Sequence, residues 1–109
     1  MVRHLQKEID KLKKSILSVG ILVEESLRDS VKALSDRNID LAKKVIEGDN
    51  LIDQLEIEVE EECLKILALH QPVAIDLRFL ISVLKINNDL ERIGDLASNI
   101  AERAIALAK

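Results

Sequence analysis

The chain has 109 residues, of which 48% are hydrophobic and 33% charged, and its formal net charge is −4. This length suits one domain, and the single aromatic residue, three glycines and one proline argue against β-sandwiches and barrels, which need turns and aromatic or β-branched strands at close intervals. The acidic balance disfavours nonspecific nucleic-acid binding, which needs clustered Lys and Arg. The composition predicts a single all-α domain over residues 1–109.

The opening residues contain no apolar signal region, and no stretch approaches the roughly 18 apolar residues of a membrane span. The lone cysteine, Cys63, cannot form an intramolecular disulfide. It falls in line with Ile52 and Val59, so we interpret it as a buried core residue. We therefore expect a cytoplasmic protein.

A first long helix is predicted by apolar residues that recur at steps of three or four, which keeps them on one face. These residues are Leu5, Ile9, Leu12, Ile16, Val19, Val23, Leu27 and Leu34. The polar cluster at residues 35–38 is expected to end this helix and to cap the next one.

Two further helices follow by the same reasoning. The second carries Leu41, Val45, Ile52, Leu55, Val59, Cys63 and Ile66 on its apolar face, and the third carries Phe79, Val83, Ile86, Leu90, Ile93, Ala97, Ile100, Ala101 and Ala104. The second helix should end before Pro72, where capping of its last carbonyls is the favoured role of His70 and contact with a partner is the alternative. Each helix runs about 30 residues, or about 45 Å. Because the connections are short, we predict an antiparallel up-down-up three-helix bundle of long helices.

Two acidic pairs stand out on the second and third helices. Asp49 with Asp53, and Glu91 with Asp95, each place two carboxylates one helical turn apart on the same face. The pairs lie at similar distances before and after Pro72, so a chain reversal there brings them to the same height. These four residues are the predicted metal ligands, and Glu56, Asn88 and Glu102 are candidate additional ligands on the same two faces.

The chemistry of these side chains favours a hard cation. Like charges one turn apart destabilise a helix, and no Lys or Arg shares the acidic arc of the second helix. Oxygen ligands suit Mg²⁺, Ca²⁺, Mn²⁺ or oxo-bridged iron, whereas zinc usually recruits His or Cys. Gly48 and Gly94 adjoin the two pairs, which indicates close backbone approach there. The alternative is that both acidic faces are ordinary solvated surface.

Three segments of the sequence together resemble one repeat of the PhoU family of phosphate-uptake regulators. They are Gly-Asp-Asn-Leu-Ile-Asp at 48–53, His-Gln-Pro-Val-Ala-Ile-Asp-Leu-Arg at 70–78, and Asn-Asp-Leu-Glu-Arg-Ile-Gly-Asp-Leu-Ala-Ser-Asn-Ile-Ala-Glu at 88–102. The resemblance implies a three-helix-bundle domain whose paired acidic motifs hold a multinuclear metal centre of iron or zinc. It also implies an adaptor that contacts the ATPase of a phosphate transporter and a membrane sensor kinase, peripheral to those membrane complexes.

The chain departs from the family in size, because PhoU proteins typically carry two such bundles in tandem. It is either a single-repeat relative that dimerises or one half of a longer protein, and its start at Met1 and stop after Lys109 fit the first alternative. Apolar residues off the main stripes should be exposed and favour a homodimer. These are Leu17, Ile21, Leu51, Ile57 and Leu64.

Three classes of function remain open on the sequence. The favoured one is a metal-binding regulator without enzymatic activity, since the sequence offers no catalytic nucleophile, phosphate-cradling glycine loop or poised general base. A di-iron carboxylate oxidase is the enzymatic rival, but it needs four helices and Glu-x-x-His motifs, which the sequence lacks. The third is a structural oligomerisation bundle whose acidic faces keep it in solution.

Overall fold

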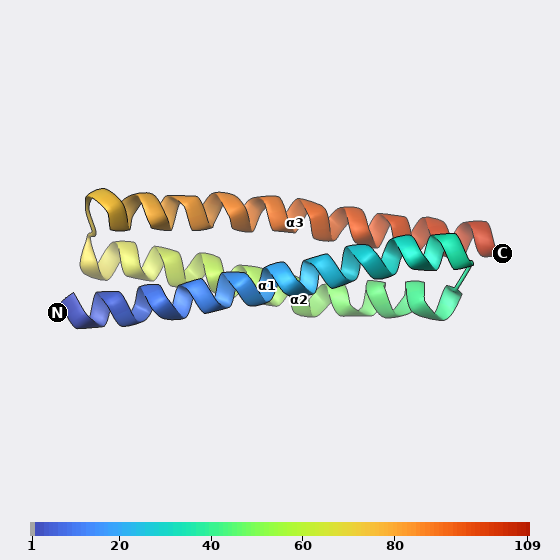
Figure 1. Cartoon of the computed structure of the whole chain (residues 1–109), viewed down its shortest axis with the longest axis horizontal. Helices are drawn as coiled ribbons and strands as arrows, with labels where there is room; N and C mark the ends of the chain where they lie inside the picture. The colour runs from blue at the N-terminus through green and yellow to red at the C-terminus, as the bar shows by residue number, and fades with distance from the viewer. Residues whose placement is uncertain (1) are drawn as a thin grey trace.

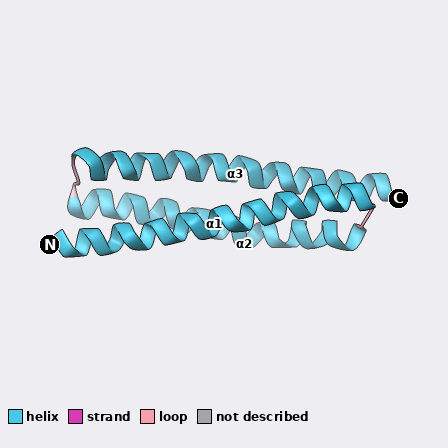
Figure 2. Ribbon diagram, viewed as in Figure 1, coloured by secondary structure: helices cyan, strands magenta, loops and turns pink. Residues whose placement is uncertain are grey.

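The computed structural model describes residues 2–109, and the side chains of residues 4–109. It contains three helices, α1 (Val2–Asp36), α2 (Ile39–His70) and α3 (Ala74–Ala108), joined by two short loops (Figures 1 and 2). Helices α1 and α3 run in the same direction and α2 runs against them, in a rod of 57 × 17 × 16 Å (Figure 1). The predicted all-α, up-down-up bundle is confirmed. Across the described residues, no helix combines the length and apolar character needed to cross a membrane.

Local capping explains where the helices end. Asn38 is the N-cap of α2, and its side-chain oxygen accepts a hydrogen bond from the Leu41 N–H at 3.0 Å, as the polar cluster predicted. At the other end of α2, Gln71 takes a left-handed conformation with φ of 43°, and its N–H donates to the Leu67 carbonyl. Pro72 follows, which cannot continue the hydrogen-bond pattern.

The expected role of His70 as a capping side chain is wrong. The backbone of Gln71 closes α2, and the His70 ring instead lies against α1, where its Nε2 is 3.0 Å from Oε2 of Glu8. The pair is partly buried and joins the end of α2 to the beginning of α1. It therefore links residues 62 positions apart in the sequence.

The core divides along the rod into two clusters. The first consists mostly of large side chains, namely Leu12, Val19, Val23, Ile52, Val59, Cys63, Ile66, Leu80 and Val83. The second is built mainly from alanine, namely Ala33, Ala42, Val45, Ala97, Ala101 and Ala104. Cys63 is fully buried, as expected, and burial, followed by the nearby charges of Glu62 and Glu60, raises the pKa of its thiol to about 11.

The predicted apolar face of α3 needs correction. Ile86 and Ile93 are 48% and 36% exposed, while Asn87 and Gly94 are buried in their place. The core positions of α3 follow steps of three and four at Leu80, Val83, Asn87, Leu90, Gly94, Ala97, Ala101 and Ala104. A residue one position earlier is rotated by about 100° and leaves this seam. Leu34, 37% exposed beside the buried Ala33, departs from the α1 prediction similarly.

The five apolar residues expected to lie off the main stripes are all exposed. They are Leu17, Ile21, Leu51, Ile57 and Leu64, with exposed fractions between 49% and 64%. Their exposure is consistent with an uncovered apolar surface. The homodimer that was inferred from it stays a prediction.

Candidate metal centre

The structure brings three of the four predicted ligands together. Asp49 and Asp53 lie one turn apart on α2, and Asp95 reaches them from α3. One carboxylate oxygen from each can be chosen so that all three lie within 4.8 Å of one another. This is the spacing expected where three carboxylates share a cation.

The fourth predicted ligand, Glu91, lies in a groove between α2 and α3 that also contains Asp53 and Asp95. The groove has a volume of about 260 Å³ and is lined by Asp53, Glu56, Ile57, Glu60, Asn87, Glu91 and Asp95. Glu91 is exposed and contributes from α3, one turn before Asp95. The groove therefore extends the group of three aspartates along the helices, with carboxylates on both walls.

Glu56 is the buried acid of this groove, with only 5% of its surface exposed. Its Oε2 is buried and meets no hydrogen-bond partner among the described residues. Burial raises the pKa of Glu56 to about 7, and the charges of Asp53, Glu91, Asp49 and Asp95 add to the rise. A carboxylate in this position is stabilised by any cation that enters the groove.

Asp49 is similarly placed at the contact between α2 and α3. Burial raises the pKa of its carboxyl, the charge of Asp53 adds to the rise, and the neighbouring Ser98 hydroxyl opposes it. Its Oδ1 is buried, and no hydrogen bond of ordinary geometry reaches that atom within residues 2–109. The oxygen would lie 3.8 Å from a Cβ placed on Gly94, which is an ordinary contact distance, so the α3 backbone lies close to Asp49 at this position.

Gly48 does not share this role. It is exposed, and a Cβ added to it would meet nothing within 4 Å. Of the two glycines that adjoin the acidic pairs, only Gly94 marks a close approach of the helices. The sequence-based expectation for Gly48 is therefore wrong.

Asn87 is a site residue that the sequence analysis did not identify. Its Nδ2 donates to the Glu56 carbonyl at 2.9 Å, and its buried Oδ1 has no partner in the described part of the chain. Asn88 and Glu102 are exposed and do not line the groove. The steps of three and four along the α3 core seam would have indicated Asn87, because they place it with Val83 and Leu90.

The donor set fits a hard metal ion. The groove offers carboxylate and amide oxygens, and buried oxygens of Asp49, Glu56 and Asn87 are left without partners in residues 2–109. The imidazole and thiol groups that zinc usually prefers lie elsewhere, since His70 pairs with Glu8 and Cys63 is in the core. These observations favour iron, manganese, magnesium or calcium over zinc.

Comparison with known proteins identifies the family of this chain. The family model described as the PhoU domain matches residues 16–104, which is most of the chain. The chain belongs to the PhoU family. The match includes α2 and most of α3, so the acidic groove lies within the part of the chain that the family model matches.

Several PhoU relatives are similar over nearly all of this chain. A phosphate-specific transport system accessory protein PhoU homolog of Aquifex aeolicus is 46% identical over 105 residues, covering 96% of this chain and 48% of the relative. A homolog of the same description from Pseudomonas aeruginosa is 47% identical over 107 residues, covering 98% of this chain and 44% of the relative.

The fold is also that of a solved PhoU structure. The crystal structure of PhoU from Pseudomonas aeruginosa superposes with a TM-score of 0.92 at 47% identity, covering 94% of this chain and 49% of that one. The chain thus spans about half the length of the PhoU relatives it matches.

Proposed function

We propose that this chain is a metal-binding PhoU-type accessory domain that regulates phosphate transport. The observation that carries the proposal is the convergence of Asp49, Asp53 and Asp95 within 4.8 Å beside the buried Glu56. Its relatives are named accessory proteins of the phosphate-specific transport system, which supports the regulatory assignment. The assignment is to a regulator, not to an enzyme.

The metal centre is proposed to be multinuclear and to contain iron. Asp53, Glu56, Glu91 and Asp95 supply four carboxyl groups along one groove, and Asp49 adds a fifth beside Asp53 and Asp95, which is more negative charge than one divalent ion offsets. Bidentate and bridging carboxylates can hold ions side by side. An all-oxygen set favours iron over zinc, and magnesium or calcium remain the redox-inactive alternatives.

Metal binding is proposed to set the rigidity of the α2–α3 face. Without a cation, Asp53 and Asp95 repel each other across the groove, so the two helices are held together by the core and by the hydrogen bond from Asn87 to the Glu56 carbonyl. A bound cation removes this repulsion, because Asp53 and Asp95 then coordinate the same ion. We propose that the face fixed in this way docks, in the cytoplasm, on the transporter ATPase or on a sensor kinase.

The first test is the metal content of protein purified without chelator or affinity tag. Elemental analysis should find more than one equivalent of iron in the parent, and Asp53→Asn with Asp95→Asn should lose it. Glu47→Gln with Glu61→Gln is the matched control, because it removes the same two charges from exposed positions outside the groove. Equal metal content in the two double variants would contradict the site.

The second test addresses docking. Purified phosphate-transporter ATPase should bind the metal-loaded chain at least about tenfold more tightly than the chelator-stripped chain, because the stripped face is less ordered. Light-scattering chromatography or interferometry measures the difference. If neither form binds the ATPase or the sensor kinase, the adaptor role is refuted while the metal assignment stands.

A further inference from the structure

A second groove runs between α1 and α2, and we call it the α1–α2 groove. It shares no lining residue with the acidic groove between α2 and α3. Three hollows follow one another along it, with volumes of about 300, 370 and 170 Å³. Its lining begins at Glu8 and Ile66 and ends at Asp29 and Lys44. This distance corresponds to 21 positions on α1, or about 32 Å, which is the length of a helix of about 20 residues.

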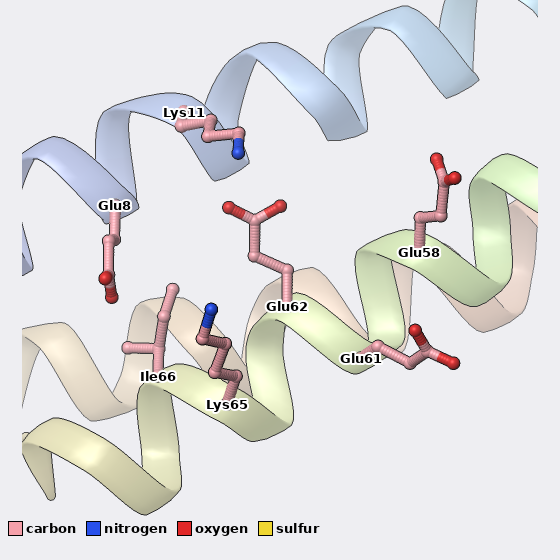
Figure 3. Close-up of a pocket in the computed structure, with 7 residues that line it drawn as sticks. All are labelled: Glu8, Lys11, Glu58, Glu61, Glu62, Lys65 and Ile66. Carbon is pink, nitrogen blue, oxygen red and sulfur yellow. The ribbon is translucent and has the colours of Figure 1, made fainter.

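Negative charge predominates around the α1–α2 groove. At one end, Lys11 and Glu62 extend toward one another from the two helices (Figure 3). The whole lining contains six acidic residues, against the three lysines Lys11, Lys44 and Lys65. Among the six, only Glu8 is in an ion pair with a described residue, and that residue is His70. The excess of acidic residues over lysines attracts a basic partner.

The floor of the α1–α2 groove is apolar. Val19, Leu55 and Val59 line its middle hollow. The hollow at the far end, which we call the end hollow, is lined by Leu22, Val45, Leu51 and Ile52. Leu51 is 57% exposed, and Leu22 and Leu55 are half-buried. A partner that covers this floor gains apolar burial as well as charge pairing.

Small side chains keep the α1–α2 groove open. The Ser15 and Ser18 hydroxyls donate to backbone carbonyls of α1 at 3.1 and 3.0 Å, so neither needs a partner from outside. Ser26, in the end hollow, is different, because its Oγ is buried and has no hydrogen-bond partner in residues 4–109. Glu25 and Asp29 line the same hollow. A lysine or arginine head from a partner would satisfy the hydroxyl and pair with these carboxylates.

We propose that the α1–α2 groove binds an amphipathic helix of another protein, in which lysine or arginine residues flank an aliphatic stripe. The stripe would pack on Leu51 and Leu55, and the basic side chains would reach the carboxylates of Glu58 and Glu62. A helix in this position contacts α1 and α2 together and completes a four-helix bundle. The length, the charge and the apolar floor of the groove all match this one kind of partner.

Other occupants fit the α1–α2 groove less well. A second copy of this chain has a net charge of −4, and its three helices are already packed against one another, so it would place acidic surface against acidic surface. Nucleic acid is repelled for the same reason. A free metal ion or a small amine would fill one hollow and leave the rest of the apolar floor uncovered.

This docking surface goes beyond the proposed function and does not depend on the metal centre. The two grooves lie on different flanks of α2. A domain built in this way can hold a basic helix in one groove and a cation in the other, with neither blocking the other.

The first experiment uses a synthetic peptide of about 20 residues with leucines along one helical face and lysines on both sides of them. It should bind the metal-stripped chain, one peptide per chain, in calorimetric titration at about 0.15 M salt, where charges farther apart than about 8 Å are largely screened. A control peptide with glutamate in place of every lysine should bind at least about tenfold more weakly. Failure of the lysine peptide to bind, or equal binding of both peptides, would overturn the proposal.

Amide chemical shifts locate the bound peptide. Ser18, Ser26 and Gly48 in the α1–α2 groove should shift, whereas Asn87 and Asp95 in the acidic groove should not. Addition of Mg²⁺ at constant ionic strength should change the affinity for the peptide by less than about twofold. A peptide that Mg²⁺ displaces would lie in the acidic groove, and the proposal would be wrong. Protein that binds no metal tests the peptide equally well, so failure of the metal centre and failure of this proposal are distinguishable.

The charges of the α1–α2 groove are tested by Glu58→Gln with Glu62→Gln, which should weaken binding of the lysine peptide at least about tenfold. The matched control is Glu47→Gln with Glu102→Gln, which removes the same number of charges from exposed positions that line neither groove. The control should bind within about twofold of the parent. Equal weakening in the two variants would show general charge attraction and contradict the proposal.

The apolar floor is tested by Leu51→Ser, which should weaken binding at least about fivefold, because the helix loses an aliphatic contact. Leu64→Ser is the control, because Leu64 is 52% exposed on the same helix, against 57% for Leu51, and lines none of the three hollows. Circular dichroism should show both variants folded, since both positions are on the surface. If Leu64→Ser weakens binding as much as Leu51→Ser, or if neither does, the helix is not bound in this groove.

Discussion

The two halves of the rod are packed by different means. In one half, long aliphatic side chains such as Leu12, Ile66 and Leu80 fill the space between the helices. In the other, Ala97, Ala101 and Ala104 hold the core positions of α3. Each large side chain buries more apolar area, so most of the stability per residue should come from the first half.

The group of Asp49, Asp53 and Asp95 lies where the two packing modes meet, and the acidic groove runs from it into the half with large side chains. Asp49 falls between Val45 of the alanine-rich cluster and Ile52 of the large-residue cluster. On α3, the small residues Gly94 and Ala97 occupy the facing core positions. Small core residues allow neighbouring helices to approach. The alanine-rich half is therefore expected to hold the carboxylates in position, and the half with large side chains is expected to supply most of the stability.

The largest effect should come from Leu80→Ala. Leu80 is fully buried in the large-residue cluster, so its truncation removes apolar contacts and leaves a cavity. We expect a loss of about 3 kcal/mol in the free energy of unfolding, measured by urea denaturation of metal-stripped protein. Metal affinity of the folded variant should stay within a factor of about three of the parent. A large loss of affinity would show that the two halves do not have separate roles.

The opposite pattern is expected for Ala97→Leu. The extra side chain has no space at a fully buried position of the alanine-rich cluster, and should destabilise the protein by about 1–3 kcal/mol. Because it forces α3 away from its neighbours beside Asp95, it should also weaken metal binding by at least about tenfold. Calorimetric titration of the folded variant measures this. Unchanged affinity would mean that close helix packing does not position the ligands.

Sequence reasoning located the helices and the acidic pairs because both depend on local spacing. Alternating steps of three and four define a face, and Asp49 and Asp53 are neighbours on any helix. Sequence reasoning failed where it had to choose which of two adjacent residues, such as Ile86 and Asn87, occupies a core position. Hydrophobicity favours the isoleucine for the core, yet the seam that continues from Val83 selects Asn87, whose amide bonds the Glu56 carbonyl. The contact between Glu8 and His70 joins distant segments, so no local pattern indicates it.

The charge of Glu56 should make the metal-free protein less stable as pH rises. Its folded pKa of about 7 exceeds its ordinary value of 4.5, so folding favours the protonated form. Stability should therefore fall between about pH 4.5 and 7 and level off above 7. Glu56→Gln should remove this slope and raise stability at pH 8 by on the order of 1 kcal/mol, allowing for solvent at the open side of the groove.

Thermal denaturation in chelator across this pH range tests the assignment, with Glu47→Gln as an exposed control on the same helix. A parent-like slope in Glu56→Gln would assign the pH dependence to another group. Metal binding should show the reverse trend, because protons compete with cations for the same carboxylate. Affinity should weaken as pH falls through about 7.

The smallest effects should come from the two glycines next to the acidic pairs. Gly48→Ala should stabilise the protein by about 0.5–1 kcal/mol, since a helix gains from alanine and the added Cβ meets nothing within 4 Å. At Gly94 the new methyl would lie 3.8 Å from Asp49 Oδ1 and 3.9 Å from Ile52 Cγ2, which are ordinary contacts. The fold should persist, but the methyl covers a buried carboxylate oxygen that the proposed metal centre uses. Thermal denaturation and metal titration of both variants should therefore show lowered affinity only for Gly94→Ala, and equal affinities would place the metal away from Asp49.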